Sequence, residues 1–184
     1  MTVMKGSWPT VFSQNLPSPV LVTGGAGFIG SHLVEALVRQ NLEVRVIDNL
    51  SAGKLQNLSP VLNKIEFYQE DIRNRSFLKK LVQGASTVFH LAGMSSVPQS
   101  QLEPSLCLDI NGQGTLNVLE LAASSGVKRL VYASSSAVYG ELPPLHREEL
   151  RPSPDSPYAA VKLLGEHLGQ YYRQSMGLLT ISLR

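Results

Sequence analysis

Cysteine is almost absent from this chain, since Cys107 is the only one among 184 residues. A disulfide framework and a cluster of metal-binding thiolates are therefore excluded, and a reducing cytosol is favoured. The four histidines are His32, His90, His146 and His167, and they lie far apart without the spacing of metal ligands. The sequence gives no reason to expect a metal.

An excess of one charge is also lacking. The 16 basic and 14 acidic residues give a formal net charge of +2 and are scattered along the chain without a Lys/Arg run, so nucleic acid is not an expected partner. No stretch approaches the roughly 20 apolar residues that cross a bilayer. Residues 1–18 have neither the charged nor the apolar region of a secretory signal. We expect a cytoplasmic protein without a membrane partner.

The chain is long enough for roughly one domain with a substantial core. We expect residues 1–18 to be a leader and residues 19–184 to be the domain. Trp8, Phe12 and Leu16 recur at intervals of four. This spacing is compatible with one helical turn docked on the domain, although a loosely ordered leader is the favoured interpretation.

Apolar, β-branched runs alternate with segments of helical period, which predicts a parallel sheet with crossover helices. The expected strands are Pro19–Thr23, Glu43–Asp48, Lys64–Tyr68, Thr87–Ala92, Arg129–Ser134 and Leu178–Leu183. The expected helices are Phe28–Gln40, Leu116–Gly126 and Tyr158–Gln174. The Pro-rich stretch 143–157 is expected to be a surface loop. The predicted fold class is α/β and doubly wound, with about six parallel strands and helices on both faces.

A glycine-rich turn connects the first strand to the first helix. Its pattern is satisfied twice, by Gly25, Gly27 and Gly30 and by Gly24, Gly27 and Gly30. Glycine permits the tight turn, the approach of a pyrophosphate to the backbone and the close packing of helix on strand. The phosphates would then meet the free N–H groups at the start of the helix, near Phe28 and Ile29.

The context of this motif makes it specific. An apolar strand precedes it, an amphipathic helix follows, and Asp48 ends the next strand 18 residues after Gly30. A carboxylate there accepts both ribose hydroxyls of NAD, whereas it would repel the 2′-phosphate of NADP. The alternative is a glycine-rich turn with an incidental aspartate. The sequence therefore predicts a Rossmann-type domain that binds NAD.

A second set of residues predicts proton chemistry. Tyr158 and Lys162 are four residues apart on the predicted helix, so they share one face. A nearby cation favours phenolate and brings a tyrosine closer to use as a base. Ser134, Ser135 and Ser136 follow the fifth strand, at the edge where open α/β sheets bind ligands. Each serine could instead cap a turn, and Ser135 is the favoured functional one.

In these motifs the sequence resembles the extended short-chain dehydrogenase/reductases, specifically the NAD-dependent sugar-nucleotide epimerase/dehydratase group. The resemblance runs from Val20 to Arg184. Its motifs are VTGGAGFIGSHLVEALV, VRVIDNLSAGK, FYQEDIRN, VFHLAG, NGQGTLNVLELA, LVYASSSAVYGE, SPYAAVKLLGE and TISLR. Their number and order make the resemblance highly specific.

The resemblance assigns roles to residues of this chain. The implied catalytic residues are Ser135, Tyr158 and Lys162. The implied cofactor-binding residues are Gly24, Gly27, Phe28, Ile29, Gly30, Asp48, Asn49, Ser51, Gly53, Asp71, Ile72, Leu91, Ala92, Gly93, Asn111, Tyr158 and Lys162. In the family the Asp71 carboxylate and the Ile72 backbone would bind adenine, and Asn111 helps to set up the active site. The implied substrate-binding residues are Ser95, Ser96, Ser135, Ser136 and Tyr158.

The resemblance also implies a reaction on a nucleotide sugar, most simply a UDP-hexose or UDP-N-acetylhexosamine. Its dehydratase members usually carry an acidic residue shortly after the catalytic Ser/Thr, whereas Ser136 and Ala137 stand here. This favours 4-epimerisation by transient oxidation at C4 and return of the hydride over a dehydratase or reductase. Ser95 and Ser96 resemble the N-acetylhexosamine branch, although Gln99 replaces a basic residue common in that branch.

Members of this family continue past the sixth strand into a smaller substrate domain, which we expect to be absent here. Two hypotheses follow. One is an epimerase whose catalytic half is represented by this chain, and the other is a non-catalytic NAD-binding module or truncated relative. Family members pair through helices of the nucleotide domain, which predicts a homodimer contact through Leu106–Ala123 and Tyr158–Gln174.

Overall fold

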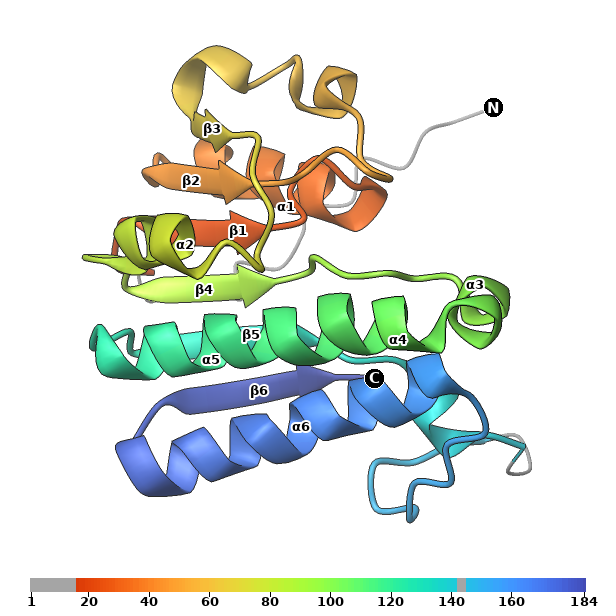
Figure 1. Ribbon diagram of the computed structural model, residues 1–184. Coiled ribbons are helices and arrows are strands. Elements are labelled where there is room, and N and C mark those ends of the chain that lie inside the picture. The colour runs from red at the N-terminus through yellow and green to blue at the C-terminus, as the bar shows by residue number, and fades with distance from the viewer. Residues whose placement is uncertain (1–15, 142–144) are drawn as a thin grey trace, which may run out of the picture.

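A six-stranded parallel sheet forms the centre of the molecule, in the order β3-β2-β1-β4-β5-β6 (Figure 1). The computed structural model describes residues 16–141 and 145–184. The strands are β1 (Val20–Thr23), β2 (Val44–Ile47), β3 (Glu66–Tyr68), β4 (Thr87–His90), β5 (Arg129–Ala133) and β6 (Leu179–Leu183). The chain thus winds outward from β1 to β3, returns to β4 beside β1, and winds outward again.

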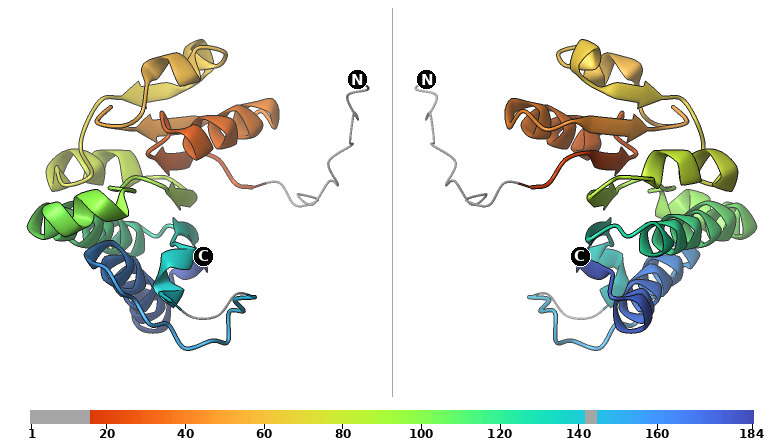
Figure 2. Two further views of the ribbon diagram at one scale, coloured as in Figure 1. Left: turned by 90° about the vertical axis from the view of Figure 1, so that its right-hand side faces the viewer. Right: turned by 90° about the vertical axis from the view of Figure 1, so that its left-hand side faces the viewer.

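Helices lie on both faces of the sheet. They are α1 (Phe28–Arg39), α2 (Arg75–Val82), α3 (Val97–Leu102), α4 (Pro104–Cys107), α5 (Gly114–Ser124) and α6 (Pro157–Met176). Helix α1 covers one face, and α2, α5 and α6 cover the other (Figure 2). This arrangement confirms the predicted doubly wound Rossmann-type fold.

The six predicted strands are all present, each one or two residues shorter than predicted. The predicted helix from Leu116 instead begins at Gly114 and is the end of a longer helical rod, in which a π-helical segment (Leu108–Gln113) joins α4 to α5. Short 3₁₀ turns occur at Leu55–Leu58, Leu62–Lys64 and Ser136–Tyr139. The helices that periodicity did not predict are short, so tertiary packing stabilises them more than their own sequence does.

Each face of the sheet carries its own apolar core. Leu21, Val88 and Leu130 are fully buried under α2, α5 and α6. Val22 and Val46 are fully buried under α1, and Leu16 packs against this second cluster. Trp8 and Phe12, the other members of the predicted apolar turn, lie outside the described residues.

The chain reverses its winding direction between β1 and β4, which are neighbours in the sheet. Ligands of open α/β sheets bind at the carboxyl ends of the strands at such a reversal. Among the described residues, no helix is long and apolar enough to cross a membrane, and no group of three or more His, Cys, Asp or Glu side chains is arranged to hold a metal ion.

Candidate functional site

Three glycines of the turn after β1 are required by the protein's own packing. A β-carbon on Gly24 would lie 2.6 Å from the backbone nitrogen of Ala92, and Gly24 has a φ of +72°. A β-carbon on Gly25 would lie 2.5 Å from the Val46 side chain, and one on Gly30 would collide with the Gly24 carbonyl. The motif therefore fixes how closely α1 approaches β1 and β2.

Gly27 differs, because a β-carbon there would meet only the Gly24 carbonyl, at 3.3 Å. Gly27 is the N-cap of α1, and no side chain caps this helix. Phe28 and Ile29, in the first turn, are 78% and 68% exposed. The positive end of a twelve-residue helix thus faces open space beside bare backbone, which fits the pyrophosphate of a dinucleotide.

Asp48 follows β2 directly and is tied to this turn. Its carboxylate accepts hydrogen bonds from the backbone nitrogens of Ala26 at 2.9 Å and Leu50 at 2.8 Å, one on each oxygen. A carboxylate offers about four acceptor sites, so two remain for a diol. The predicted ribose-binding position is therefore buried, oriented by backbone and still able to accept further hydrogen bonds.

The loop after Asp48 packs against the glycine turn. Ala26 O accepts from Lys54 N, and a β-carbon on Gly53 would lie 2.9 Å from the Ala26 carbonyl carbon. Asn49 accepts from Ser51 N and donates to the Asp71 carboxylate at 2.9 Å. These contacts bring the loops that follow β2 and β3 together with the glycine turn. These loops contain four of the predicted cofactor-binding residues, Asn49, Ser51, Gly53 and Asp71.

Asp71 is less free than its predicted adenine contact suggests. Arg73 donates to both of its oxygens, at 2.8 and 2.9 Å, and lowers the pKa of the carboxyl to about 2. Arg73 also donates to Asp109 at 2.6 Å. Ile72, beside it, is buried against Gly114, and its carbonyl accepts from Asn117. An adenine contact at Asp71 would share the carboxylate with Arg73.

A buried network of hydrogen-bonded side chains lies where the winding reverses between β1 and β4. His90 Nδ1 lies 2.7 Å from Thr23 Oγ1, and His90 Nε2 lies 2.9 Å from Thr115 Oγ1. Thr23 Oγ1 also accepts from Ala92 N at 3.2 Å, and Thr23 O accepts from Leu91 N at 3.0 Å. Burial lowers the pKa of His90 to about 3, so the ring is neutral. This network attaches residues 91–93, which are predicted to flank the cofactor, to β1 and α5.

Asn111 also holds the loop that follows β4, through two hydrogen bonds with the backbone of Met94. Its amide donates to Met94 O at 2.9 Å and accepts from Met94 N at 2.7 Å. A β-carbon on Gly93 would lie 2.6 Å from Asn111 Oδ1 and 3.8 Å from Lys162 Nζ. Asn111 lies in the π-helical segment, a local widening often found at functional sites. Asn111 therefore positions the loop that follows β4 close to Lys162.

Tyr158 and Lys162 lie together in the first two turns of α6, as their spacing predicts. Lys162 Nζ lies 5.7 Å from the centre of the Tyr158 ring and 5.0 Å from that of Tyr132. It donates to Ala133 O at 2.8 Å. Burial lowers the pKa of Lys162 to about 8. A buried ammonium beside a buried phenol is the arrangement that proton transfer needs.

The three serines after β5 have three different environments. Ser135 Oγ accepts from Ala137 N at 3.1 Å and so caps the 3₁₀ turn. Ser134 donates to Glu166, and Ser136 is exposed. The capping interpretation therefore holds for Ser135 itself. A hydroxyl that accepts from the backbone keeps its own proton to donate to a reacting oxygen, so capping and the predicted function are compatible.

The predicted substrate serines lie at the entrance of α3. Ser95 and Ser96 are both exposed, and Ser96 caps α3 by accepting from Gln99 N at 3.2 Å. Ser100, which the sequence did not indicate, is fully buried and accepts from Tyr158 N at 3.2 Å. It holds the start of α6, together with the Ser156 cap. The Ser156-Pro157 pair was the available sequence signal, since a serine followed by proline is typical of a helix start.

Comparisons with known proteins agree with this geometry. Residues 20–184 match the NAD dependent epimerase/dehydratase family. A putative UDP-glucose 4-epimerase of Methanocaldococcus jannaschii is 40% identical over 162 residues, which is 86% of this chain and 52% of that protein.

Solved structures show the same relation. The UDP-N-acetylglucosamine 4-epimerase of Methanobrevibacter ruminantium, in complex with UDP-N-acetylmuramic acid, is 40% identical with a TM-score of 0.85, over 90% of this chain and 53% of that one. The Thermus thermophilus UDP-glucose 4-epimerase complex with NAD is 44% identical with a TM-score of 0.83, over 90% and 54%. The chain thus spans about half the length of the relatives it matches. It belongs to the NAD-dependent epimerase/dehydratase family.

Proposed function

We propose that this chain is the NAD-binding and catalytic half of a nucleotide-sugar 4-epimerase that acts on a UDP-hexose or UDP-N-acetylhexosamine. The observation that carries the proposal is the buried Tyr158–Lys162 pair, which lies at the same strand edge as the open backbone at Gly27. The three similar proteins described above are named as 4-epimerases of UDP sugars, and this supports the substrate class.

The residues of this chain divide the work by position. Gly27, with the first turn of α1, receives the pyrophosphate, and Asp48 accepts the ribose hydroxyls. When bound, NAD supplies a hydride acceptor. Tyr158 takes the proton of the sugar C4 hydroxyl, and Ser135 donates a hydrogen bond to the same oxygen. Lys162, held by Ala133 O, places positive charge beside the Tyr158 ring.

The lack of an acidic side chain directly after Ser135 favours epimerisation over dehydration. Dehydration requires a further carboxyl beside the sugar to move a second proton, and Ser136 and Ala137 stand where the family's dehydratases usually carry one. Glu166 is the carboxylate that contacts this strand end, and it accepts from Ser134 and Arg184. The Glu166 carboxylate is therefore engaged in these structural hydrogen bonds, and we assign it no part in proton transfer.

An NAD-binding module without turnover is the second candidate. Remote parts of a nucleotide sugar supply binding energy that holds the reacting carbon in place, and this chain spans about half of its relatives. The glycine turn and Asp48 both lie within this chain. In this second candidate function the chain binds NAD and does not turn over a nucleotide sugar.

Two measurements separate these functions. NAD is titrated by calorimetry, and failure to bind at millimolar NAD would contradict both candidates. Interconversion of UDP-glucose with UDP-galactose, and of the N-acetyl pair, is then followed with NAD bound. Turnover supports the epimerase, and NAD binding without turnover leaves the module.

Paired substitutions test the assigned roles. Asp48→Ala should weaken NAD binding about tenfold or more, because the ribose hydroxyls lose a charged acceptor. Tyr158→Phe keeps the ring and should affect NAD binding much less than Asp48→Ala does, while it lowers turnover by roughly 10²- to 10⁴-fold, the usual contribution of a proton-transfer group. Equal loss of NAD affinity in the two variants contradicts the roles.

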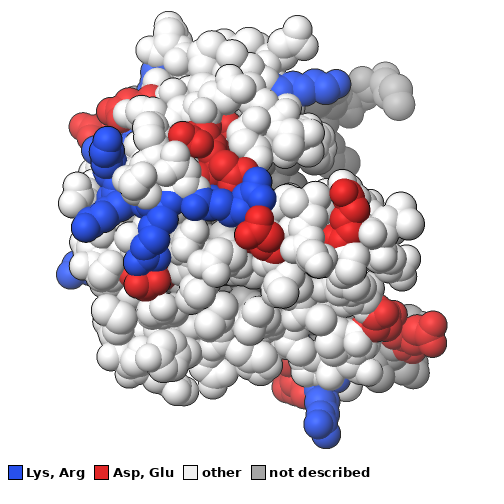
Figure 3. Space-filling model, viewed as in Figure 1, with Lys and Arg blue, Asp and Glu red and all other residues white. Residues whose placement is uncertain are grey.

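We further infer that two copies pair through α5 and α6. The face that these helices present is largely uncharged, in contrast to the mixed charges around α2 (Figure 3). The exposed apolar side chains on α3, α6 and the π-helical segment are Leu102, Leu108, Leu164, Tyr171 and Met176. Sedimentation of the wild type and of Leu164→Asp tests this pairing. A dimer that the substitution dissociates supports it, and a wild-type monomer at micromolar concentration overturns it.

A further inference from the structure

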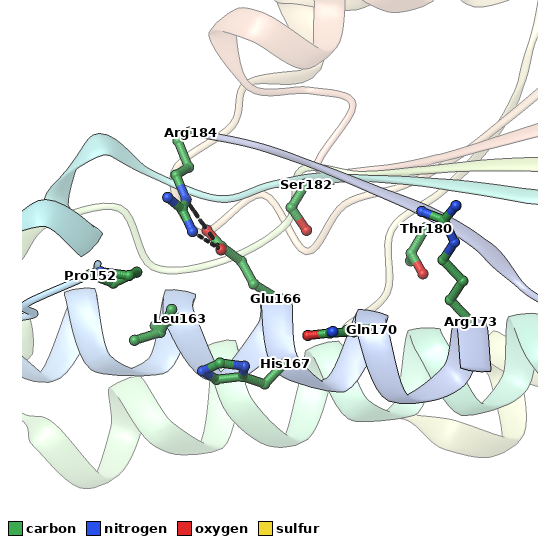
Figure 4. A pocket seen from close by; sticks show the side chains of 9 residues that line it. All are labelled: Pro152, Leu163, Glu166, His167, Gln170, Arg173, Thr180, Ser182 and Arg184. Atoms are coloured by element: carbon green, nitrogen blue, oxygen red, sulfur yellow. Dashed lines mark hydrogen bonds and ion pairs between the residues drawn. The ribbon is translucent and has the colours of Figure 1, made fainter. Parts of the chain in front are cut away.

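Glu166 and Arg184 form an ion pair on the far side of the β5 end from the cofactor site. Arg184 Nη2 lies 2.7 Å from Glu166 Oε2, and Arg184 Nε donates to the same carboxylate at 3.0 Å (Figure 4). The side chains are only 12% and 18% exposed. They line one end of a groove of about 380 Å³ between α6 and β6. Glu166 is one helical turn beyond Lys162.

Each partner of the ion pair also holds one end of a short segment. Glu166 accepts a hydrogen bond from the Ser134 hydroxyl. Arg184 Nη1 donates to the Tyr139 hydroxyl at 3.1 Å, and the guanidinium lies 5.0 Å from the centre of the Tyr139 ring. Ser134 directly precedes Ser135, the N-cap of the 3₁₀ turn, and Tyr139 is the last residue of that turn. The ion pair therefore clamps both ends of the segment that carries Ser135.

The charges of the pair are maintained at neutral pH. Burial raises the pKa of Glu166, but the hydrogen bonds from Arg184 and Ser134 outweigh it and leave the pKa below the usual value. A carboxylate that accepts from three donors in fixed directions has little freedom to move. Partly buried ion pairs contribute little net stability and can instead specify geometry. Positioning is thus the physical role that suits this pair.

We propose that the Glu166–Arg184 ion pair is a positioning device for Ser135, because it fixes Ser134 and Tyr139 and so sets where the Ser135 hydroxyl points. The proposal rests on the proposed function, in which Ser135 donates to the sugar oxygen. A shift of about 1 Å in such a group can cost roughly 100-fold in rate. Glu166 and Arg184 act through Ser135 and touch neither cofactor nor substrate.

A thiol in place of the hydroxyl reports the position of residue 135 without any need for turnover. In a Cys107→Ala background, Ser135→Cys places sulfur where Ala137 N donates to the present oxygen. That hydrogen bond favours the thiolate, so the thiol should titrate below the usual value of about 8.5. The titration midpoint is measured from the pH dependence of labelling by iodoacetamide, in the full chain.

The ion pair is then broken in this background. Glu166→Ala should raise the midpoint by about half a unit or more, towards 8.5, because the segment loses its fixed direction. The Arg184 guanidinium that this change leaves unpaired acts in the opposite direction, so Ser134→Ala, which alters no charge, measures the positional effect alone. Glu166→Gln keeps one acceptor and should shift it less. Ser134→Ala leaves the ion pair intact, frees only one end of the segment and guards against a misfolded Glu166 variant. Arg173→Gln, which alters the same groove two turns away, is the matched control and should not shift the midpoint.

An unchanged midpoint in folded Glu166→Ala and Ser134→Ala proteins overturns the positioning role, whatever the activity of the wild type. A raised midpoint with no turnover in the wild type supports the positioning of residue 135 and contradicts the epimerase instead.

Where turnover is measurable, a cycle with Ser135→Ala adds a second test. Glu166→Ala should lower kcat about tenfold at unchanged NAD affinity, and should cause no further loss in the Ser135→Ala background. Equal losses in both backgrounds would show that Glu166 supports the fold rather than Ser135, and would overturn the proposal.

Discussion

The two halves of the sheet differ in how one of their faces is covered. A row of aligned side chains crosses that face in register, and it consists of Val46, Val22, Phe89, Val131 and Ile181. Val46 and Val22 are fully buried beneath α1, whereas Ile181 at the other end is 41% exposed. Among the described residues, no helix covers this end of the row (Figure 2). The β1–β3 half is thus closed on itself, and the β4–β6 half is open on one face.

The difference follows from the winding of the chain. Crossovers between parallel strands are right-handed, so α1, which leads from β1 outward to β2, lies on one face. The helices that lead outward in the opposite direction, α5 and α6, lie on the other face. The half that holds the glycine turn is therefore complete by itself. The half that carries Ser135, Tyr158 and Lys162 retains apolar surface for a further layer, because parallel sheets are normally covered on both faces.

The largest expected effect tests how tightly the closed half is packed. Gly24→Ala should destabilise the protein by about 3 kcal/mol or more, because a β-carbon at positive φ would also press on the Ala92 backbone. Gly126→Ala is the matched control, since Gly126 has a φ of +76° and nothing within 4 Å of its β-carbon position. It should cost about 1 kcal/mol. Urea unfolding measures both, and similar losses would show that the turn can relax.

A smaller effect tests the comparison along the row itself. Val22→Ala removes two buried methyl groups and should cost about 2 kcal/mol, whereas Ile181→Ala should cost less than about 1 kcal/mol because its side chain is already part exposed. The measurement is urea unfolding at low protein concentration. If the loss at Ile181 equals that at Val22, the exposed end of the row is covered in solution, and the comparison between the halves fails.

The same contrast explains what the sequence could predict. The strands, α1, the glycine turn and the Tyr158–Lys162 pair depend on local period and spacing, and the structure contains all of them. Helix α2 was not predicted, although Asn74 caps it by accepting from Phe77 N. Its eight residues are too few to show a clear period or to be stable alone.

Contacts between residues far apart in sequence were also beyond prediction. His90 and Thr23 are 67 positions apart, and Tyr158 and Ser100 are 58 apart. Nothing in either residue's own surroundings specifies the partner, because the register of the sheet and the packing of α3 bring them together. Glu166 belongs to the same class, since its partners Ser134 and Arg184 come from two different strand ends.

The smallest of these effects concerns His90, which joins the two halves by contacting Thr23 on β1 and Thr115 on α5. Its pKa is about 3 in the folded protein, because of burial, against about 6.5 when unfolded. The unfolded chain therefore binds a proton first as the pH falls, and this group alone should remove about 1.4 kcal/mol of stability between roughly pH 7.5 and pH 5.5. His90→Gln should be less stable at pH 7.5 and should lose correspondingly less on acidification. Urea unfolding at the two pH values measures the difference, in which the contributions of the other histidines cancel. Equal losses in the two proteins would mean that the His90 ring takes up its proton within the fold, and that the joint between the halves opens before the halves themselves unfold.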